Sequence, residues 1–232
     1  PTILKLAGEP VPAFIQGKPF VGGDTSDQNT YIFATKDRMS EAKDRVRAVR
    51  DQRFKYIRNY MPEIPAAGYV PYRMNIDMMQ ELRALHKLGK LTDVQSLWLE
   101  PRPPEELYDT ENDPYEINNL AADAAHQHTL KRLAAALNDW LSTHKDWGEM
   151  LEEDMVEEFW PGYQQPFTSP VVFSQANGLL VLSSSTKGAS IGYRVNGGEW
   201  QLYSNPLNMS SEKTLEAKAI RYGFKKSAIS SF

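Results

Sequence analysis

The sequence contains no cysteine. Within these 232 residues that absence excludes disulfide bonds, cysteine-ligated zinc and a thiol nucleophile. Long apolar runs are also missing, so no segment has the length of a membrane span, and no signal-like stretch opens the chain. We therefore expect any export signal to lie upstream. The lack of cysteine does not identify a compartment, because exported and cytosolic proteins can both lack it.

A large excess of either charge is missing as well. The formal net charge of −4 gives no net attraction to nucleic acid or to an anionic membrane, although local basic patches could still provide it. Hydrophobic residues make up 41% of the chain and charged residues 24%, as in soluble globular proteins. The chain is therefore apolar enough to bury a sizeable core, in one large domain or in two ordinary ones.

The first eight residues, PTILKLAG, have the pattern of a helix end. Ile3, Leu4 and Leu6 are apolar, and Gly8 stands where glycine commonly ends a helix. A helix this short is not stable alone, and the segment has no initiator methionine. We therefore expect this chain to continue a longer polypeptide whose earlier part is absent.

Three strands are predicted in the first third of the chain. Residues 29–35, NTYIFAT, are rich in β-branched and aromatic side chains and predict one strand. Residues 44–60 predict two more, joined by a turn at Asp51 and Gln52. Apolar residues spaced two apart predict one buried face of this hairpin, made by Val46, Ala48, Phe54 and Tyr56.

Two helices are predicted beyond the hairpin. The proline-rich stretch 62–104 suggests a long excursion that holds one helix at about 76–88, closed by Gly89. A second helix, at about 126–145, should pack on the hairpin sheet. Its apolar face follows three-four spacing and consists of Leu130, Leu133, Ala134, Leu137, Trp140 and Leu141.

The stretch EELYDTENDPYEINNLA, residues 105–121, predicts a strand followed closely by a helix start. Leu107 and Tyr108 supply the short strand. Three residues then favour a helix: Asp113 as N-cap, Pro114 in the first helical position and Glu116 three residues after the cap.

The residue pattern changes in the rest of the chain, where helical periodicity is nearly absent. We expect an acidic linker at 149–166 and a small antiparallel β-sandwich of five to seven strands at 167–232, after a first domain at 1–148. The sandwich prediction rests on a hairpin turn at 196–198 and on alternating Leu215, Ala217 and Ala219. The predicted fold class is α+β, a small antiparallel sheet packed by a long helix, followed by an all-β, Ig-like sandwich.

These segments, taken in order, resemble the C-terminal subdomain of the type I sulfatase family, in the alkaline-phosphatase-like superfamily. The resemblance covers Pro1 to about Trp147 and is carried by PTILKLAG, QGKPF, YIFATKDRM, DRVRAVRDQRFKYIRNY, RPPEELYDTENDPYEINNLA and a closing helix that contains tryptophan. It is strongest with exported bacterial members that act on sulfated glycans. The tail from about Phe167 resembles the β-sandwich appended to bacterial glycan-degrading enzymes and known from chitobiase-type hexosaminidases.

The resemblance implies chemistry that these residues do not carry. Type I sulfatases use a formylglycine, made from Cys or Ser in a C/S-x-P-x-R sequence, beside a calcium ion held by Asp and Asn. No such sequence occurs in this chain. The resemblance therefore places formylglycine, calcium and every catalytic and metal-binding residue in an N-terminal sulfatase domain, which would be the partner of this chain. It further implies a periplasmic or extracellular protein, with this part forming one wall of the cleft that takes a sulfated carbohydrate.

Lys36, Asp37 and Arg38 are the predicted substrate-binding residues. They directly follow the predicted strand at 29–35, where loops often present polar groups to a ligand. A sulfated sugar offers anionic oxygens and hydroxyls, which suit an arginine fork and a carboxylate acceptor. The alternative is a strand end held by salt bridges.

Other candidate residues have a structural alternative that we expect to hold. Six basic residues could attract a polyanion or form the solvated face of the hairpin: Arg45, Arg47, Arg50, Arg53, Lys55 and Arg58. Tyr69, Tyr72 and Arg73 could reach distal sugars, but we expect them to pack on the sheet. Trp200 and Tyr203 could stack on a sugar, but in so small a sandwich we expect them in the core. The four histidines lack metal-site spacing.

Three functions from different classes therefore remain open. The first is the C-terminal part of a sulfuric ester hydrolase, inactive alone. The second is a non-catalytic carbohydrate-binding module, which the β-rich tail favours. The third is a nucleic-acid binder that uses the basic hairpin, which the acidic balance of the chain disfavours. The particular glycan and the oligomeric state do not follow from the sequence.

Overall fold

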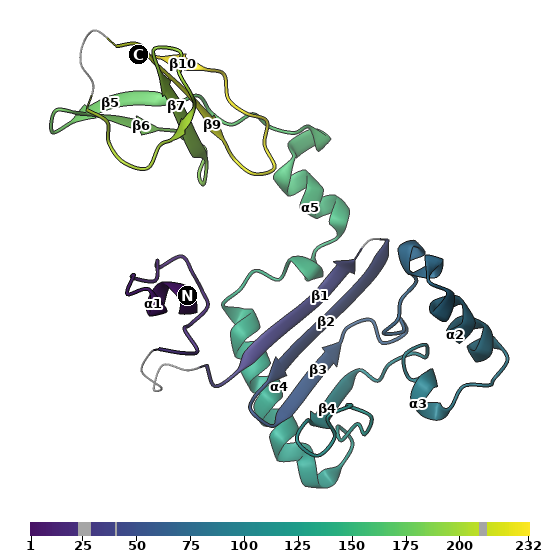
Figure 1. Cartoon of the computed structure of the whole chain (residues 1–232). Helices are drawn as coiled ribbons and strands as arrows, with labels where there is room; N and C mark the ends of the chain where they lie inside the picture. The colour runs from purple at the N-terminus through teal and green to yellow at the C-terminus, as the bar shows by residue number, and fades with distance from the viewer. Residues whose placement is uncertain (23–28, 40, 209–212) are drawn as a thin grey trace. The chain divides into compact units, whose positions relative to one another are not determined.

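The computed structural model describes residues 1–22, 29–39, 41–208 and 213–232. The chain forms two compact units, which we call unit 1 (Pro1–Glu149) and unit 2 (Met150–Phe232). Unit 1 contains α1 (Thr2–Leu6), β1 (Ile32–Met39), β2 (Ala42–Arg50), β3 (Phe54–Asn59), η2 (Pro71–Asn75), α2 (Asp77–Lys87), α3 (Asp93–Ser96), β4 (Glu105–Asp109), η3 (Ala124–His126), α4 (Gln127–Ser142) and η4 (Trp147–Glu149) (Figure 1).

Unit 1 is an antiparallel sheet with strand order β1-β2-β3-β4, and α4 lies along one face of it (Figure 1). Val49 faces Tyr56 across β2 and β3, and Tyr56 faces Leu107 across β3 and β4, so three fully buried side chains form one row. Leu133 and Leu137 of α4 are also fully buried against this row. The predicted sheet packed by a long helix is therefore present, and burial of the apolar face of α4 stabilises it.

The predicted buried face is wrong in one strand. Val49 and Arg47 of β2 are buried on the side of Tyr56, whereas Val46 and Ala48 belong to the opposite face and are only half-buried. Successive residues of a strand point to opposite faces, so an assignment shifted by one residue inverts the whole strand. The cause is Arg47, a charged residue with only 1% of its surface exposed.

The predicted helix start at Asp113 is also wrong. Asp113 does form a cap-like turn, because its Oδ2 accepts from the amides of Ile117 and Asn118 at 2.8 and 2.7 Å. Glu116, however, has φ of 55°, which a continuing right-handed helix does not allow. The helical segment begins ten residues later, where the Asp123 carboxylate accepts from the amide of Ala125. The stretch 105–121 is therefore a strand followed by a folded loop.

The excursion after β3 contains the predicted helix, α2, and a one-turn helix, α3, that the pattern did not indicate. Gly89 follows α2 with φ of 62°, the left-handed conformation that favours glycine at a helix end. No helix in the described part of the chain combines the length and the apolar character that crossing a membrane would need.

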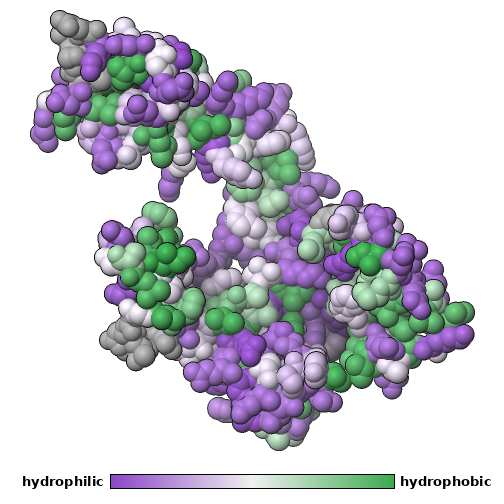
Figure 2. All heavy atoms as spheres, in the orientation of Figure 1, coloured by the Kyte–Doolittle hydropathy of each residue, from purple (hydrophilic) through white to green (hydrophobic). Residues whose placement is uncertain are grey.

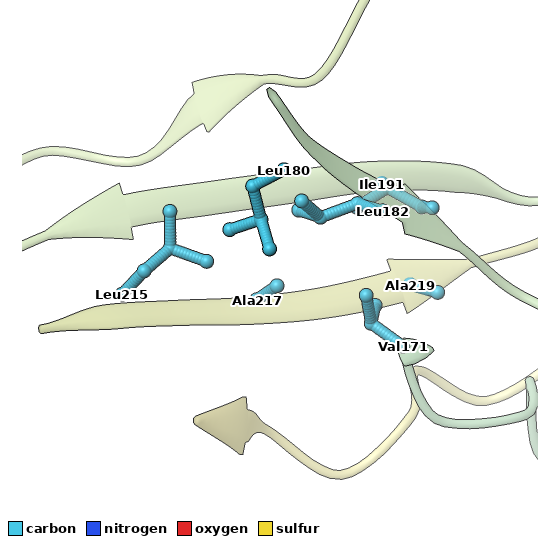
Figure 3. Packing of buried hydrophobic residues seen from close by; sticks show 7 residues of the cluster. All are labelled: Val171, Leu180, Leu182, Ile191, Leu215, Ala217 and Ala219. Carbon is cyan, nitrogen blue, oxygen red and sulfur yellow. The ribbon is translucent and has the colours of Figure 1, made fainter. Parts of the chain in front are cut away.

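Unit 2 begins with a helix and continues as two antiparallel sheets. Its elements are α5 (Glu152–Phe159), η5 (Pro161–Tyr163), β5 (Val172–Ala176), β6 (Leu179–Ser183), β7 (Ser190–Val195), β8 (Gln201–Leu202), β9 (Leu215–Ile220) and β10 (Ser230–Ser231). The stretch expected as an acidic linker thus contains α5. Figure 3 shows the side chains of β6, β7 and β9 gathered into one core, in which Leu215, Ala217 and Ala219 are fully buried, as their alternation predicted.

Candidate functional site

Lys36, Asp37 and Arg38 lie inside a strand, which corrects their expected position after one. β1 extends to Met39 because its pairing with β2 continues past the predicted end, with Lys36 opposite Val46 and Arg38 opposite Lys43. The register shifts between Lys36 and Arg38, so the ladder is irregular at Asp37. All three side chains are half-buried.

Asp44 connects the first of these residues to the excursion. Its carboxylate is almost fully buried and lies 2.9 Å from Lys36 Nζ and 2.7 Å from Arg102 Nη2. Burial alone would raise the pKa of Asp44, but hydrogen bonds from Arg102 and Lys36 outweigh it and hold the pKa below its usual value. Arg102 also donates to the carbonyl of Ile64 at 2.8 Å, so one ion-pair cluster ties β1 and β2 to the excursion.

Arg47 connects the second residue to the segment after α4. Its Nη1 lies 2.7 Å from Asp37 Oδ1, and its Nη2 donates to Asp146. Arg45 donates to the other oxygen of Asp146 at 2.9 Å. Burial would lower the pKa of Arg47, but the carboxylates of Asp146 and Asp37 raise it; burial would raise the pKa of Asp146, but both arginines lower it. The cluster is therefore ionised and internally compensated at neutral pH.

Arg38, the third residue, points to the same segment. Its Nη1 donates to the carbonyl of Trp147 at 3.3 Å. The sequence-predicted residues are thus brought together with Asp44, Arg47, Arg102 and Asp146, none of which sequence reasoning singled out as a partner. Lys36 and Asp37 form ion pairs, as the structural alternative required, and contact with a substrate stays a prediction for all three residues.

The cluster leaves no room for a side chain at Gly148. A Cβ atom built there would collide with Asp37 Oδ1 and Arg47 Nη2. We expect Gly148→Ala to destabilise unit 1 by about 1–3 kcal/mol, the usual range for overpacking, as measured by urea unfolding. Gly68→Ala is the matched control, because a Cβ there would make only ordinary contacts of 3.7 Å or more. Equal stability of the two variants would show that the packing around Arg47 is loose.

The basic residues of the hairpin do not form a free cationic stripe. Arg47 is buried in the cluster, and the others have partners of their own: Arg45 with Asp146, Arg50 with Thr110, Arg53 with Asp109, Lys55 with Glu116 and Arg58 with Asn138. Hydrogen bonds from Arg53 hold the pKa of Asp109 well below its usual range. Carboxylates therefore compensate four of these six cations, whereas the partners of Arg50 and Arg58 are neutral.

The aromatic residues that the sequence offered as possible sugar contacts lie partly in the core and partly on the surface. Tyr203 packs on the core of unit 2, as expected. The ring of Trp200 is covered by Lys218 at 3.8 Å and Arg194 at 4.9 Å. Tyr69 and Tyr72 are 62% and 78% exposed, so the expectation that they pack on the sheet is wrong.

No metal centre is evident among the residues that the structure describes, since none of their His, Asp and Glu side chains gather in groups of three or more. His86 instead lies 2.7 Å from Glu100, and His126 lies 2.9 Å from Asp123.

Comparison with known proteins gives similarity in sequence over nearly the whole chain. The chain is 39% identical to an ulvan-active sulfatase of Formosa agariphila over 98% of its own length and 39% of that protein. It is 27% identical to another ulvan-active sulfatase of the same organism, over 67% of the chain and 30% of that protein. The chain thus spans about two fifths of the length of the first of these relatives.

The match to a solved structure covers a smaller share of the chain than the match to the first relative in sequence. A solved 2-O GAG sulfatase matches 65% of this chain and 25% of its own, with 24% sequence identity and a TM-score of 0.42. No family model matches the chain.

Proposed function

We propose that this chain is the C-terminal part of a sulfuric ester hydrolase of the sulfatase family that acts on sulfated glycans. The observation that carries the proposal is the 39% identity to an ulvan-active sulfatase over 98% of the chain. An aligned segment of this length at this identity covers both units, so the likeness is not confined to one motif. Ulvan, the substrate that the relative's name states, is the first glycan to test.

The catalytic groups belong, in this proposal, to an N-terminal domain of the longer protein. That domain would hold the formylglycine and the calcium ion, and the whole protein would work in the periplasm or outside the cell. In support, the first residues of this chain expose large apolar side chains: Ile3 by 83%, Leu6 by 63%, Phe14 by 84% and Phe20 by 76%. Figure 2 shows this apolar surface over the N-terminal segment. An exposed patch of this kind is typical of an interface, and we assign the N-terminal domain to it.

Unit 1 would form one wall of the substrate cleft. Lys36, Asp37 and Arg38 are the proposed contacts to the sulfated glycan, and the ion-pair cluster would hold the end of β1 in place. Because its buried charges are compensated, this support can be rigid without attracting the substrate itself. The domain limits 1–148 and 167–232, and an Ig-like sandwich of the hexosaminidase type in the second, are part of the proposal.

A non-catalytic carbohydrate-binding module is the alternative function. It is favoured by the exposed aromatic rings of unit 2, among them Tyr222, which is 100% exposed. Nucleic-acid binding has less support, because carboxylates and other partners engage the basic side chains of the hairpin.

The test compares this chain with the longer protein. We expect the 232-residue chain alone to release no sulfate from an aryl sulfate or from ulvan in calcium at neutral pH, and the longer protein to release sulfate from ulvan. An empty-vector preparation is the control. Sulfate release by the chain alone would place catalytic residues inside it. A longer protein that binds ulvan without hydrolysing any sulfated glycan would favour the binding module.

A further inference from the structure

Unit 2 contains a pocket of about 490 Å³ with aromatic walls. It lies between α5 and the turn that follows β9, and we call it the aromatic pocket. Its lining includes Phe159, Trp160, Arg221, Tyr222, Gly223 and Phe224. Pockets of this volume hold small ligands, and those with apolar walls and a few polar groups bind them most often.

The pocket is built from hydrogen bonds that fix its walls. The amide of Arg221 donates to the buried Thr168 hydroxyl at 3.0 Å, and the amide of Phe224 donates back to the Arg221 carbonyl at 3.0 Å, which closes a turn. Gly223 stands in this turn with φ of 84°, where other residues would be strained. Trp160 Nε1 donates to the Gly223 carbonyl at 2.9 Å and orients the indole ring. The site is therefore formed before any ligand binds, which lowers the entropy lost on binding.

Its aromatic rings are unusually exposed for so small a unit. Tyr222 is fully exposed at the tip of the turn, and Phe159 is 40% exposed at the end of α5. A single exposed ring has no meaning by itself, but several rings around one hollow form an apolar surface that a ligand can cover. Aromatic rings offer a flat apolar face, and tyrosine and tryptophan add a polar edge. The apolar C–H face of a pyranose ring fits such a surface.

Cations lie directly beside these rings. The Arg221 guanidinium lies 4.7 Å from the centre of the Phe224 ring, and Lys225 Nζ lies 5.0 Å from that of Phe167. Phe167, Lys225 and Lys226 line a second hollow, whose lining follows directly in sequence on that of the aromatic pocket. Residues 167–232 hold seven Lys and Arg but three Asp and Glu, although the whole chain is acidic. Anionic groups are therefore favoured on this side of the pocket.

We propose that the aromatic pocket and the cations beside it bind a sulfated polysaccharide, the ligand class that follows from the proposed function. Sugar rings stack on Tyr222 and Trp160, and sulfate groups meet Arg221 and Lys225, where a guanidinium can donate two parallel hydrogen bonds. The opposite wall comes from α5 and the residue after it, through Val156, Phe159 and Trp160, and it carries no basic side chain. The ligand's sulfates therefore lie toward residues 221–226 and its uncharged faces toward α5.

The test measures binding by the 232-residue chain, without any hydrolysis. Affinity electrophoresis and titration calorimetry are run with ulvan, with chemically desulfated ulvan and with a neutral β-glucan. We expect binding to ulvan that weakens steeply with salt and at least about tenfold weaker binding to the two uncharged or desulfated chains. Equal binding to all three polysaccharides, or to none, would overturn the proposal.

Matched variants locate the site. Tyr222→Ala and Arg221→Ala should each weaken binding about five- to tenfold, and Arg221→Lys should recover part of that loss. Tyr115→Ala and Lys213→Ala are the controls: Tyr115 is 85% exposed in unit 1, Lys213 is exposed, and neither lines the pocket. Unchanged binding by Tyr222→Ala and Arg221→Ala, with melting temperatures like those of the controls, would exclude this pocket as the site.

The outcome is separable from that of the proposed function. If the 232-residue chain does not bind ulvan, the aromatic-pocket proposal fails, but the longer protein can still release sulfate from ulvan. Conversely, a longer protein that releases no sulfate removes the proposed activity, whereas ulvan binding that depends on Tyr222 would still support the aromatic pocket.

Discussion

Replacing Arg47 with alanine is expected to destabilise unit 1 by about 3 kcal/mol. The side chain is 1% exposed, and its loss leaves the carboxylates of Asp37 and Asp146 without their shared cation. Removing one member of a buried ion pair typically costs about 3–5 kcal/mol, since the remaining charge stays desolvated. We choose the lower end because the Asp37 side chain is 26% exposed and can recover some hydration. Arg47 also donates to the carbonyl of Val46 at 2.7 Å, a bond that alanine cannot replace.

Two controls separate charge pairing from general damage. Arg50→Ala removes an exposed arginine of the same strand and should change stability by less than about 0.5 kcal/mol. Asp146→Ala combined with Arg47→Ala should be less damaging than the sum of the single changes, because each single change already removes the Arg47–Asp146 pair. Hydrogen exchange at the amides of β2 and β3 reports unit 1 alone. Additive effects, or a loss below 1 kcal/mol for Arg47→Ala, would contradict this description of the cluster.

Arg47 also explains where sequence reasoning failed. An alternating pattern assigns charged residues to the solvent face, so Arg47 led to Val46 and Ala48 as the buried positions. The opposite face of β2 is buried for two reasons. The carboxylates of Asp37 and Asp146 compensate the Arg47 guanidinium, and Val49 lies opposite the buried Tyr56. In β9, where Leu215, Ala217 and Ala219 alternate with polar residues and no charge is buried among them, the same reasoning was correct.

The long helix was predicted well, since the expected range of about 126–145 agrees with α4, whereas the separate helix start expected at Asp113 is absent. The 16 residues of α4 make about four turns of consistent apolar spacing, which a single competing interaction cannot obscure. A capping signal rests on one residue, and the carboxylates of both Asp113 and Asp123 accept backbone amides, although a helical segment follows only Asp123. Pro114 and Glu116 favoured the former, but the backbone turns at Glu116. A local capping signal therefore does not by itself show that a helix follows.

The candidate site could be predicted only in part, for a reason of chain distance. Lys36, Asp37 and Arg38 were found because they are adjacent and polar at a strand. Their partners are not local, since Asp37 meets Arg47 and, through it, Asp146, while Arg38 meets Trp147. The last two lie about 100 residues further along the chain, and no pattern within one sequence links them. Gly148 gave no signal at all, because its role is defined only by what surrounds it.

In the longer protein, Arg38→Ala is expected to lower kcat/KM on a sulfated glycan by about 1.5–3 kcal/mol, or roughly 10- to 150-fold. This is the range for a hydrogen bond to a charged group. Arg38 is the proposed contact that carries a guanidinium fork, and its half-buried side chain donates from Nη1 to the carbonyl of Trp147 at 3.3 Å. Arg38→Lys keeps the charge but loses the planar fork, so it should recover only part of the rate.

If Arg38 has a purely structural role, we expect the opposite changes in stability and in kcat/KM. If the side chain only fastens β1 to the segment after α4, its removal should lower the melting temperature and leave kcat/KM within about twofold of the unmodified protein. The two quantities are therefore measured together on both variants, with Arg50→Ala at the other end of β2 as the control for loss of a sheet arginine. A kinetic loss without a matching loss of stability would assign Arg38 to the substrate cleft. The reverse pattern would assign Arg38 to the support of the strand, because its bond to the Trp147 carbonyl would then serve only the fold of unit 1.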